Sequence, residues 1–427
     1  MNVTLLLFGT FGFLLFIGTP IVVALGASAL TVYLVTGQDF SSLIVLAYNA
    51  VDSFPIMALP AFILSGALMG DAGISRRLIS VAEALAGRAA GGLGAAAILA
   101  CMFFGAVSGS GPATTAATSM LLLPAMMDRG YSPAYAGAVT ASAGGLGIII
   151  PPSIPMVIYG VTANESISKL FLAGVVPGIL LAGTLLVVNY IRARRLGYRS
   201  SEDDLPSKSI WRVLREAIWS LLAPVVILGG IYTGMFTPTE AAVVAVFYAL
   251  FVGVVIHRES SWAGIRHALE STTWLTGRVL IIMFAATAFG RVLVENRIPA
   301  AIASEAIKLT DELALIWLVV IAFLIILGMF METLAMILIV TPVLLPVMTE
   351  FGVDPIHFGV VLVTCCLIGF STPPLGENMF IASSIAKQSI EAISVKAVPC
   401  VIAMIATAIL LAMVPELSLW FPSLLGF

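Results

Sequence analysis

The sequence predicts an all-α polytopic membrane protein with two inverted repeats, each containing a re-entrant hairpin and a broken helix. Three observations predict this fold. Of the 427 residues, 60% are hydrophobic and only 10% are charged, and the mean hydropathy is +1.11. A pattern of Gly and Pro recurs at a constant separation of 222 residues, as from Pro151 to Pro373. The charges that flank the two copies of this pattern have opposite signs.

The composition excludes a soluble protein, because a soluble domain carries about 25% charged residues. At roughly 20 residues per helix, the chain accommodates on the order of ten to twelve membrane crossings. A transmembrane barrel would alternate apolar and polar residues, whereas Leu315–Met329 is apolar on every side. The net charge of −3 gives no basic surface, so nucleic acid is excluded as a partner.

The first apolar segment, Met1–Ile17, has no Lys or Arg before it, so we expect a retained membrane helix and not a cleaved signal peptide. The four Cys lie in apolar stretches and lack the spacing of a zinc site. We expect them to be small residues of the membrane core. They are Cys101, Cys365, Cys366 and Cys400.

Lys and Arg near helix ends mark the cytoplasmic side of a membrane protein. The densest basic cluster lies in the only long polar stretch, so 192–216 is expected in the cytoplasm. Ile210–Leu222 carries two Trp and two Arg, which predicts a helix at the membrane interface. The next two helices are expected to cross outward over Leu221–Met235 and to return over Ala241–Ile256.

The flanking charges predict two hairpins of opposite orientation. Arg88 and Arg129 lie on either side of 91–127, so this stretch is expected to enter and leave from the cytoplasm, as a re-entrant hairpin or a tight helix pair. Helix 276–294 then crosses to the outside. Acidic residues dominate the flanks of 313–348, so the second hairpin is expected to open outward.

Identical residues recur in and after the two hairpins without a gap in the spacing. The pairs are Leu123 and Leu345, Pro124 and Pro346, Met126 and Met348, Gly130 and Gly352, Pro133 and Pro355, Gly137 and Gly359, Gly147 and Gly369, Pro151 and Pro373, and Pro152 and Pro374. Such a series predicts an internal repeat. Repeats of inverted topology are a signature of secondary transporters, whose sites lie near mid-membrane where the repeats meet.

The repeat divides the chain into five expected regions. Scaffold helices are expected over 1–55 and over 169–275, the latter with a cytoplasmic and interfacial segment at 192–222. The last region, 391–427, is expected to be one helix. The two transport units are 56–168, with its hairpin at 91–127 and broken helix at 131–163, and 276–390, with its hairpin at 313–348 and broken helix at 355–386.

The turns of the hairpins and the breaks of the helices form the candidate site. Ser108–Pro112 cannot continue a regular helix, and Gly144–Ser153 is interrupted by two successive Pro. Non-helical backbone at membrane depth persists only where protein buries it or a wet cavity satisfies it. Freed carbonyls and Ser or Thr hydroxyls suit an alkali cation, and helix N-termini facing the same gap favour an anionic substrate. The alternative is a structural kink.

In the second repeat, Glu332 is an acid within a long apolar run, which by default marks a functional site. The alternative is that its carboxylate caps the turn between the hairpin helices. Arg291 has two interpretations, since it can face a carboxylate substrate or extend to the outer interface. The sequence lacks a P-loop, a dinucleotide fingerprint and a nucleophile elbow, so we expect neither ATP hydrolysis nor an enzyme.

At these residues the sequence resembles the large membrane subunit of tripartite ATP-independent periplasmic (TRAP) transporters. The resemblance implies an elevator-type sodium symporter in the bacterial inner membrane, which imports small organic acids of the C4-dicarboxylate, sialic acid or other sugar-acid type. The matching stretches are Ser108–Thr115, Gly144–Tyr159, Gly234–Ala241, Gly328–Pro346 and Ser371–Phe380.

The resemblance also implies two protein partners. One is a small four-helix membrane subunit (Q type), and the other is a periplasmic substrate-binding protein (P type) that supplies most of the selectivity. Because no small-subunit sequence precedes Met1, we expect the unfused form. The coupling ion implied is Na⁺, and no ATP is expected.

Carried over from the family, each sodium site pairs a hairpin tip with the broken helix of its own repeat. The first comprises Ser108, Ser110 and the carbonyls around Gly147, Ile150 and Pro152. The second comprises Phe330, Glu332, Thr333, Gly369, Thr372 and Pro374, and its ligand set stays open because Glu332 and Thr333 replace the serine-rich tip. The implied substrate residues are Ser108, Gly109, Thr114, Glu332, Thr333 and Asn378.

Two other functions compete with this interpretation. A self-sufficient sodium–dicarboxylate symporter of related hairpin architecture tends to carry Ser-Asn-Thr at both tips, and neither tip here has that sequence. An intramembrane enzyme needs paired catalytic groups within its spans, such as two Asp or a His cluster, and the sequence lacks them.

Overall fold

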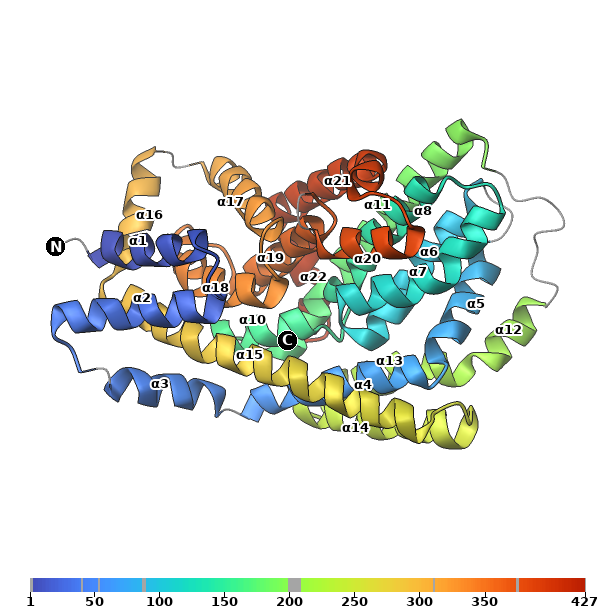
Figure 1. Cartoon of the computed structure of the whole chain (residues 1–427), viewed down its shortest axis with the longest axis horizontal. Helices are drawn as coiled ribbons and strands as arrows, with labels where there is room; N and C mark the ends of the chain where they lie inside the picture. Colours follow the sequence, from blue (N-terminus) through green and yellow to red (C-terminus); the bar gives the residue numbers. More distant parts are fainter. Residues whose placement is uncertain are drawn as a thin grey trace.

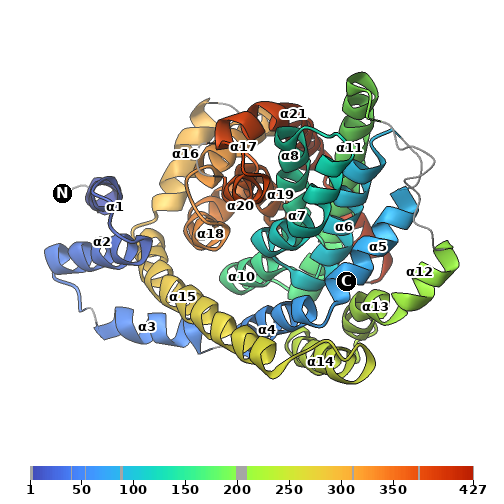
Figure 2. The same ribbon diagram turned by 45° about the vertical axis from the view of Figure 1, so that its right-hand side comes forward.

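In the computed structural model of the chain, the described residues are 3–39, 41–52, 54–86, 90–198, 209–309, 312–373 and 376–426. Every regular element among them is helical, which confirms the predicted all-α class. The helices form a round bundle that is bordered on one side by a curved belt (Figures 1 and 2).

The belt combines helices from distant parts of the chain. α4 packs against α14 and α15, and α15 also packs against α2 and α3. Its members are α1 (Val3–Phe16), α2 (Ile21–Thr36), α3 (Ser41–Val51), α4 (Ala58–Asp71), α12 (Ile210–Glu216), α13 (Ile218–Tyr232), α14 (Pro238–Leu250) and α15 (Trp262–Glu295).

The first hairpin and the first broken helix lie in the bundle. α6 (Gly92–Ser108) and α7 (Gly111–Asp128) form the hairpin. The broken helix comprises α8 (Pro133–Gly144), α9 (Leu146–Ile149) and α10 (Ile154–Ala163), and the chain bends by 42° between α9 and α10.

The second hairpin is formed by α17 (Leu313–Gly328) and α18 (Thr333–Glu350). It is followed by α19 (Pro355–Phe370) and α20 (Glu377–Ala386). The elements of the two halves are interleaved in space, because α20 packs against α7 and α8 while α10 packs against α18. Neither half is therefore a separate body.

Further helices cover this bundle. α5 (Ile74–Ala86) packs on α6, and α16 (Ile298–Leu309) packs on α18. α11 (Ile167–Leu196) packs against α21 (Ile390–Met413) and α22 (Glu416–Leu424). The region 391–427, expected as one helix, thus contains most of α21 and the separate helix α22.

Local sequence fixes where many of these helices begin. Ser132, Thr237 and Asp354 each accept a hydrogen bond from a backbone N–H of the first turn, and a Pro follows each of them. Such a cap contributes about 1 kcal/mol, and Pro is well suited to the first helical position. Thr237 and Glu240 complete a reciprocal capping box at the start of α14.

The interfacial helix and α15 also differ from the expected boundaries. The interfacial helix expected over Ile210–Leu222 ends at Glu216, and the chain bends by 57° before α13 begins at Ile218. α15 begins at Trp262, upstream of the expected 276, because Ser261 caps its first turn and accepts a hydrogen bond from the Gly264 N–H. The expected division between 275 and 276 therefore lies inside one continuous helix.

Among the described residues, six helices are long and apolar enough to cross a membrane, or up to eight if each of two bent pairs forms one span. The length and hydropathy of the chain predict more, on the order of ten to twelve membrane crossings. The difference arises because α1, α2, α6, α17 and α19 are apolar but contain only 14 to 17 residues. A full span needs about 20.

Candidate functional site

The tip of the first hairpin is a compact group of hydroxyls and backbone carbonyls. α6 ends at Ser108, and Gly109 adopts φ +62°, a conformation that glycine reaches without strain. The Ser108 and Thr114 hydroxyls lie 2.8 Å apart, and Thr114 Oγ1 donates to the Ser110 carbonyl at 2.7 Å. Ser110 is the N-cap of α7 and accepts from the Ala113 N–H.

The break of the first broken helix lies directly against this tip. A Cβ on Gly147 would approach Thr114 Oγ1 and lie 2.7 Å from the Ser110 carbonyl oxygen, so only glycine allows this contact. A Cβ on Gly109 would lie 2.7 Å from the Pro152 carbonyl oxygen. The structure therefore brings together most of the residues expected at the first sodium site.

Ile150 marks the end of α9. Its N–H donates to the Leu146 carbonyl at 3.1 Å, and its extended conformation (φ −81°, ψ 124°) interrupts the helix. Across the gap, the Ile154 N–H donates to the Gly109 carbonyl at 3.2 Å. This bond joins the hairpin tip to the start of α10.

The second hairpin also meets the broken helix of its own half. A Cβ on Gly369 would lie 2.6–2.8 Å from the backbone atoms of Gly328. Near this contact, Thr372 Oγ1 donates to the Ile368 carbonyl at 2.6 Å. The Phe330 side chain is exposed. Pro374 lies outside the described residues.

Glu332 has a different role from its counterpart in the first hairpin, Ser110. It occupies the N-cap position of α18, but its side chain makes no capping hydrogen bond. Its Oε2 instead lies 2.6 Å from Nη2 of Arg278 on α15. The alternative that Glu332 caps the hairpin turn is therefore wrong.

A cavity of about 290 Å³ adjoins this ion pair. Glu332, Arg278 and Glu377 supply its charged groups, and the remaining lining is Phe330, Met331, Phe370 and Phe380. Arg278 is not among the site residues expected from the sequence. The sequence does contain a signal for it, because Arg278 is the only charged residue between Glu270 and Arg291 and therefore lies within an apolar helical stretch.

Thr333 and Asn378 are buried and each leaves a polar atom without a partner in the described structure. These atoms are Thr333 Oγ1 and Asn378 Oδ1. The amide Nδ2 of Asn378 donates to the Ala141 carbonyl of α8 at 3.2 Å, so it ties α20 to the first half. Neither residue lines the 290 Å³ cavity, and the same is true of Ser108, Gly109 and Thr114.

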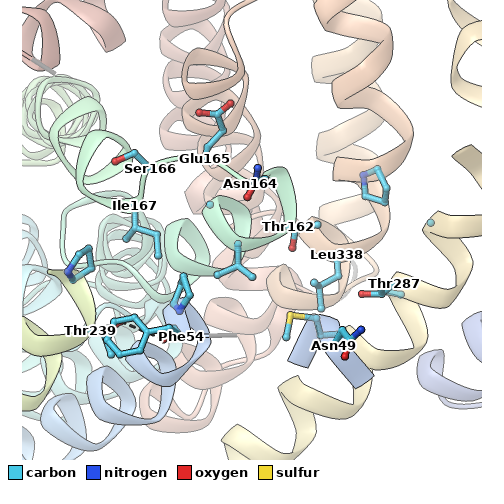
Figure 3. A pocket seen from close by; sticks show the side chains of 18 of the residues that line it. Asn49, Phe54, Thr162, Asn164, Glu165, Ser166, Ile167, Thr239, Thr287 and Leu338 are labelled. Carbon is cyan, nitrogen blue, oxygen red and sulfur yellow. Dashed lines mark hydrogen bonds between the residues drawn. The ribbon is translucent and has the colours of Figure 1, made fainter. Parts of the chain in front are cut away.

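A larger cavity of about 760 Å³ lies between the belt and the bundle. The loop between α10 and α11 supplies Glu165 and Ser166 on one side, and α15 supplies Thr287 on the other (Figure 3). No residue expected at the sodium or substrate sites lines it. The polar run 162–168 between two apolar helices is the sequence signal for this cavity.

Arg291 lies at this larger cavity and does not meet the hairpin tips. Its Nε donates to Glu295 on the next turn of α15, and the Tyr33 hydroxyl donates to the same carboxylate at 2.9 Å. The guanidinium is therefore already paired within the belt.

The donor groups at the hairpin tips suit a hard monovalent cation better than a transition metal. Within the described ranges there is no cluster of three or more His, Cys, Asp and Glu that could hold a metal ion. The four Cys are free and buried, as expected. The oxygens that converge at the first tip are hydroxyls and carbonyls.

Several curated proteins resemble the chain over nearly its full length. It is 42% identical over 416 residues to the isethionate TRAP transporter permease protein DctMQ of Oleidesulfovibrio alaskensis, covering 97% of this chain and 66% of that protein. It is 36% identical to the C4-dicarboxylate TRAP transporter large permease protein DctM of Rhodobacter capsulatus, covering 99% of each. It is 36% identical to the sialic acid TRAP transporter large permease protein SiaM of Vibrio cholerae, again covering 99% of each.

Two solved structures share the fold at low sequence identity. The YdaH transporter of Alcanivorax borkumensis aligns with a TM-score of 0.65 and 14% identity, covering 88% of this chain and 87% of that one. MtrF of Neisseria gonorrhoeae aligns with a TM-score of 0.58 and 13% identity, covering 86% and 82%. The family model of the DctM component of tripartite ATP-independent periplasmic transporters matches residues 8–417. The chain is therefore a multi-pass membrane permease that belongs to the DctM family of TRAP transporters.

Proposed function

We propose that the chain is the large membrane subunit of a sodium-coupled importer of small organic acids in the bacterial inner membrane. The relatives are named for anionic cargo, namely isethionate, C4-dicarboxylates and sialic acid. The observation that carries the sodium coupling is the group of hydroxyl and carbonyl oxygens where Gly147 meets Ser110 and Thr114. These are the ligands that Na⁺ takes in proteins where unwound backbone lines a membrane site.

Two sodium sites follow from this proposal. The first is formed by Ser108, Ser110 and the backbone around Gly147, Ile150 and Pro152. The second is formed around the contact of Gly328 with Gly369, together with Thr372 and the hairpin residues Phe330, Glu332 and Thr333. The substrate binds at the two tips beside Glu332, near Thr333 and Asn378, whose Oγ1 and Oδ1 atoms are buried without a hydrogen-bond partner.

The transport step is an elevator movement of the bundle against the belt. Inverted repeats are supported by the positions of the helices, since α7 and α18 begin 222 residues apart, at Gly111 and Thr333. The contacts of α20 with α7 and α8, and of α10 with α18, support one moving body, because separating the halves would break them. A charge held by oxygen ligands is cheaper to move through hydrocarbon than a bare ion.

The packing refines the division between scaffold and moving body. α11, which lies in the expected scaffold region 169–275, packs against α6, α19 and α21 of the bundle. α4 and α15, which lie largely in the expected transport units, pack in the belt. We therefore assign α11 to the moving body and assign α4 and α15 to the scaffold.

The proposed function requires two protein partners. A Q-type membrane subunit packs on the belt, and a P-type binding protein delivers the acid from the periplasm. The name DctMQ of the isethionate relative fits a fusion of the large and small membrane subunits. This chain aligns with 66% of that protein.

Uptake of labelled acid into proteoliposomes tests the coupling. The chain is reconstituted with its small subunit, the binding protein is added outside, and a sodium gradient is imposed. We expect uptake that needs sodium and the binding protein but no ATP. Equal uptake with choline in place of sodium would refute the coupling. Full uptake without the binding protein would favour the self-sufficient symporter.

The elevator movement has its own test. A spin label at the exposed Met120 on α7 and another at the exposed Val243 on α14 report the position of the bundle against the belt. We expect the label distance to change by several ångströms between sodium-free and substrate-loaded states. A distance distribution that is the same in every condition contradicts the movement.

A further inference from the structure

The ion pair between Arg278 and Glu332 bridges the belt and the tip of the second hairpin. Arg278 Nη2 and Glu332 Oε2 lie 2.6 Å apart. Arg278 is on α15 of the belt, whereas Glu332 directly precedes α18 of the bundle; Figure 2 shows these two helices. The pair is therefore the charged contact that couples these two parts at the hairpin tip.

The guanidinium of Arg278 has capacity for a further ligand. About half of its side chain (53%) is exposed, and within the described part of the chain Glu332 is its only ion-pair partner. Arg presents five N–H donors in a planar fork that matches a carboxylate in two-point contact. The 290 Å³ cavity beside it, walled by three Phe rings, has room for a small organic acid.

The hairpin turn does not need the carboxylate of Glu332. At the corresponding turn of the first hairpin, Ser110 caps α7 through its side chain. Glu332 leaves α18 without such a cap and reaches across to α15. The orientation of the Glu332 side chain is therefore set by its ion pair with Arg278 and not by capping of α18.

We propose that Arg278 binds the anionic group of the transported acid, and that Glu332 occupies this position when the site is empty. The inference rests on the proposed function, and it names a specificity-determining residue outside the family-derived set. The acid displaces the Glu332 carboxylate from the guanidinium, and its apolar part lies against Phe330, Phe370 and Phe380.

This exchange would couple acid binding to sodium binding. When the acid occupies Arg278, the carboxylates of Glu332 and Glu377 face the same cavity without a cation. Within the described residues Glu377 forms no ion pair while Arg278 pairs with Glu332, and its side chain is exposed. Two like charges at close range oppose each other, so a sodium ion at the hairpin tip relieves the repulsion. The acid is therefore expected to bind more tightly in sodium than in choline.

Equilibrium binding to the purified complex of the chain with its small subunit tests the inference. The probes are succinate, N-acetylneuraminate, 2,3-diketo-L-gulonate and isethionate, measured in sodium and in choline. Arg278→Gln should weaken binding of the acid that the wild type binds by about tenfold or more, since a charge-assisted hydrogen bond is lost. Arg278→Lys keeps the charge but not the fork, so an intermediate loss is expected.

Arg266→Gln is the matched control. Arg266 lies on the same helix, is 75% exposed and pairs with Glu270 at 2.7 Å, but it does not line the 290 Å³ cavity. The affinity of Arg266→Gln for the acid should stay within about twofold of wild type, because an exposed ion pair on a helix contributes little energy. Melting temperatures of all variants report folding separately from binding.

The reversed pair, Arg278→Glu with Glu332→Arg, separates a ligand site from a structural latch. It restores the ion pair but moves the guanidinium from α15 to the hairpin tip, so acid binding should stay weak. Rescue of binding to within about twofold of wild type would overturn the inference in favour of a latch.

Two further outcomes keep the two proposals distinct. Wild-type affinity in both Arg278→Gln and Arg278→Lys overturns the inference and leaves the proposed function intact. If the wild-type complex binds none of the four acids in sodium, the proposed function and the inference both fail.

Discussion

Replacing Gly147 by Ala is the sharpest test of the first sodium site. Gly147 lies where the first broken helix meets the hairpin tip, and an added Cβ would come within 2.7 Å of the Ser110 carbonyl oxygen. It would also press on Thr114 Oγ1. Ordinary contact begins at 3.4 Å, so the Ser110 backbone must withdraw by about 0.7 Å. The Thr114 hydroxyl can rotate, but the Ser110 carbonyl cannot move without the tip.

This displacement should affect both stability and sodium affinity. Overpacking a close contact costs about 1–3 kcal/mol. Metal–ligand distances tolerate only about 0.2 Å, so a carbonyl moved by several times this amount is lost as a ligand. Each loss of about 1.4 kcal/mol weakens binding about tenfold. We expect sodium affinity to fall by about tenfold or more, with a lower melting temperature.

Sodium-dependent thermal stabilisation of the purified chain measures the effect, and proteoliposome uptake measures its consequence. Gly183→Ala is the control, because Gly183 lies in the bundle helix α11 with no atom within 4 Å of the added Cβ. It should leave sodium affinity unchanged. Wild-type sodium affinity in Gly147→Ala would refute the assignment of this contact as a sodium site.

Three further predictions follow from the structure. Gly369→Ala should weaken the second sodium site, because its Cβ would lie 2.6–2.8 Å from Gly328 backbone that cannot rotate away; sodium titration of uptake checks this. Burial lowers the pKa of His257 from its ordinary 6.5, and its Nδ1 bonds the Ala72 carbonyl at 2.8 Å. As the pH falls, His257 is therefore protonated in the unfolded chain before it is protonated in the folded one. The contribution of His257 to stability should be constant above about pH 6.5 and should decrease below it. Melting temperatures of His257→Gln measured across this pH range should lack that decrease. Cysteines at Arg129 and Glu350 should label from opposite faces in intact cells, and labelling from one face would contradict inverted repeats.

Local features of the sequence predict the class of the protein and fix the start of several helices. Hydropathy and charge are sums over neighbouring residues, so they identify membrane helices without knowledge of the fold. Caps act within one turn, which is why α8, α14 and α19 begin beside Ser132, Thr237 and Asp354. The boundary of α15 was harder to predict, because its polar first turns have low hydropathy but belong to one continuous helix.

The first candidate site was accessible to sequence reasoning for a related reason. Ser108–Pro112 and Gly144–Ser153 are breaks in apolar helices, and a break at membrane depth needs a partner. The resemblance to TRAP permeases implied that each tip pairs with the broken helix of its own repeat, and the structure places Gly147 against Ser110 and Thr114. The Gly residues were informative because only they allow the backbones to approach this closely.

Hydropathy and helix-breaking residues identify a helical membrane protein with paired breaks, whereas the packing of the helices brings particular charges together. Arg278 and Glu332 are 54 residues apart and lie on different helices, so no local pattern pairs them. The division into belt and bundle is likewise a property of packing, since α4 and α15 resemble the other apolar helices in sequence. Contacts between distant helices depend on how their surfaces fit together, and hydropathy and caps do not encode that fit.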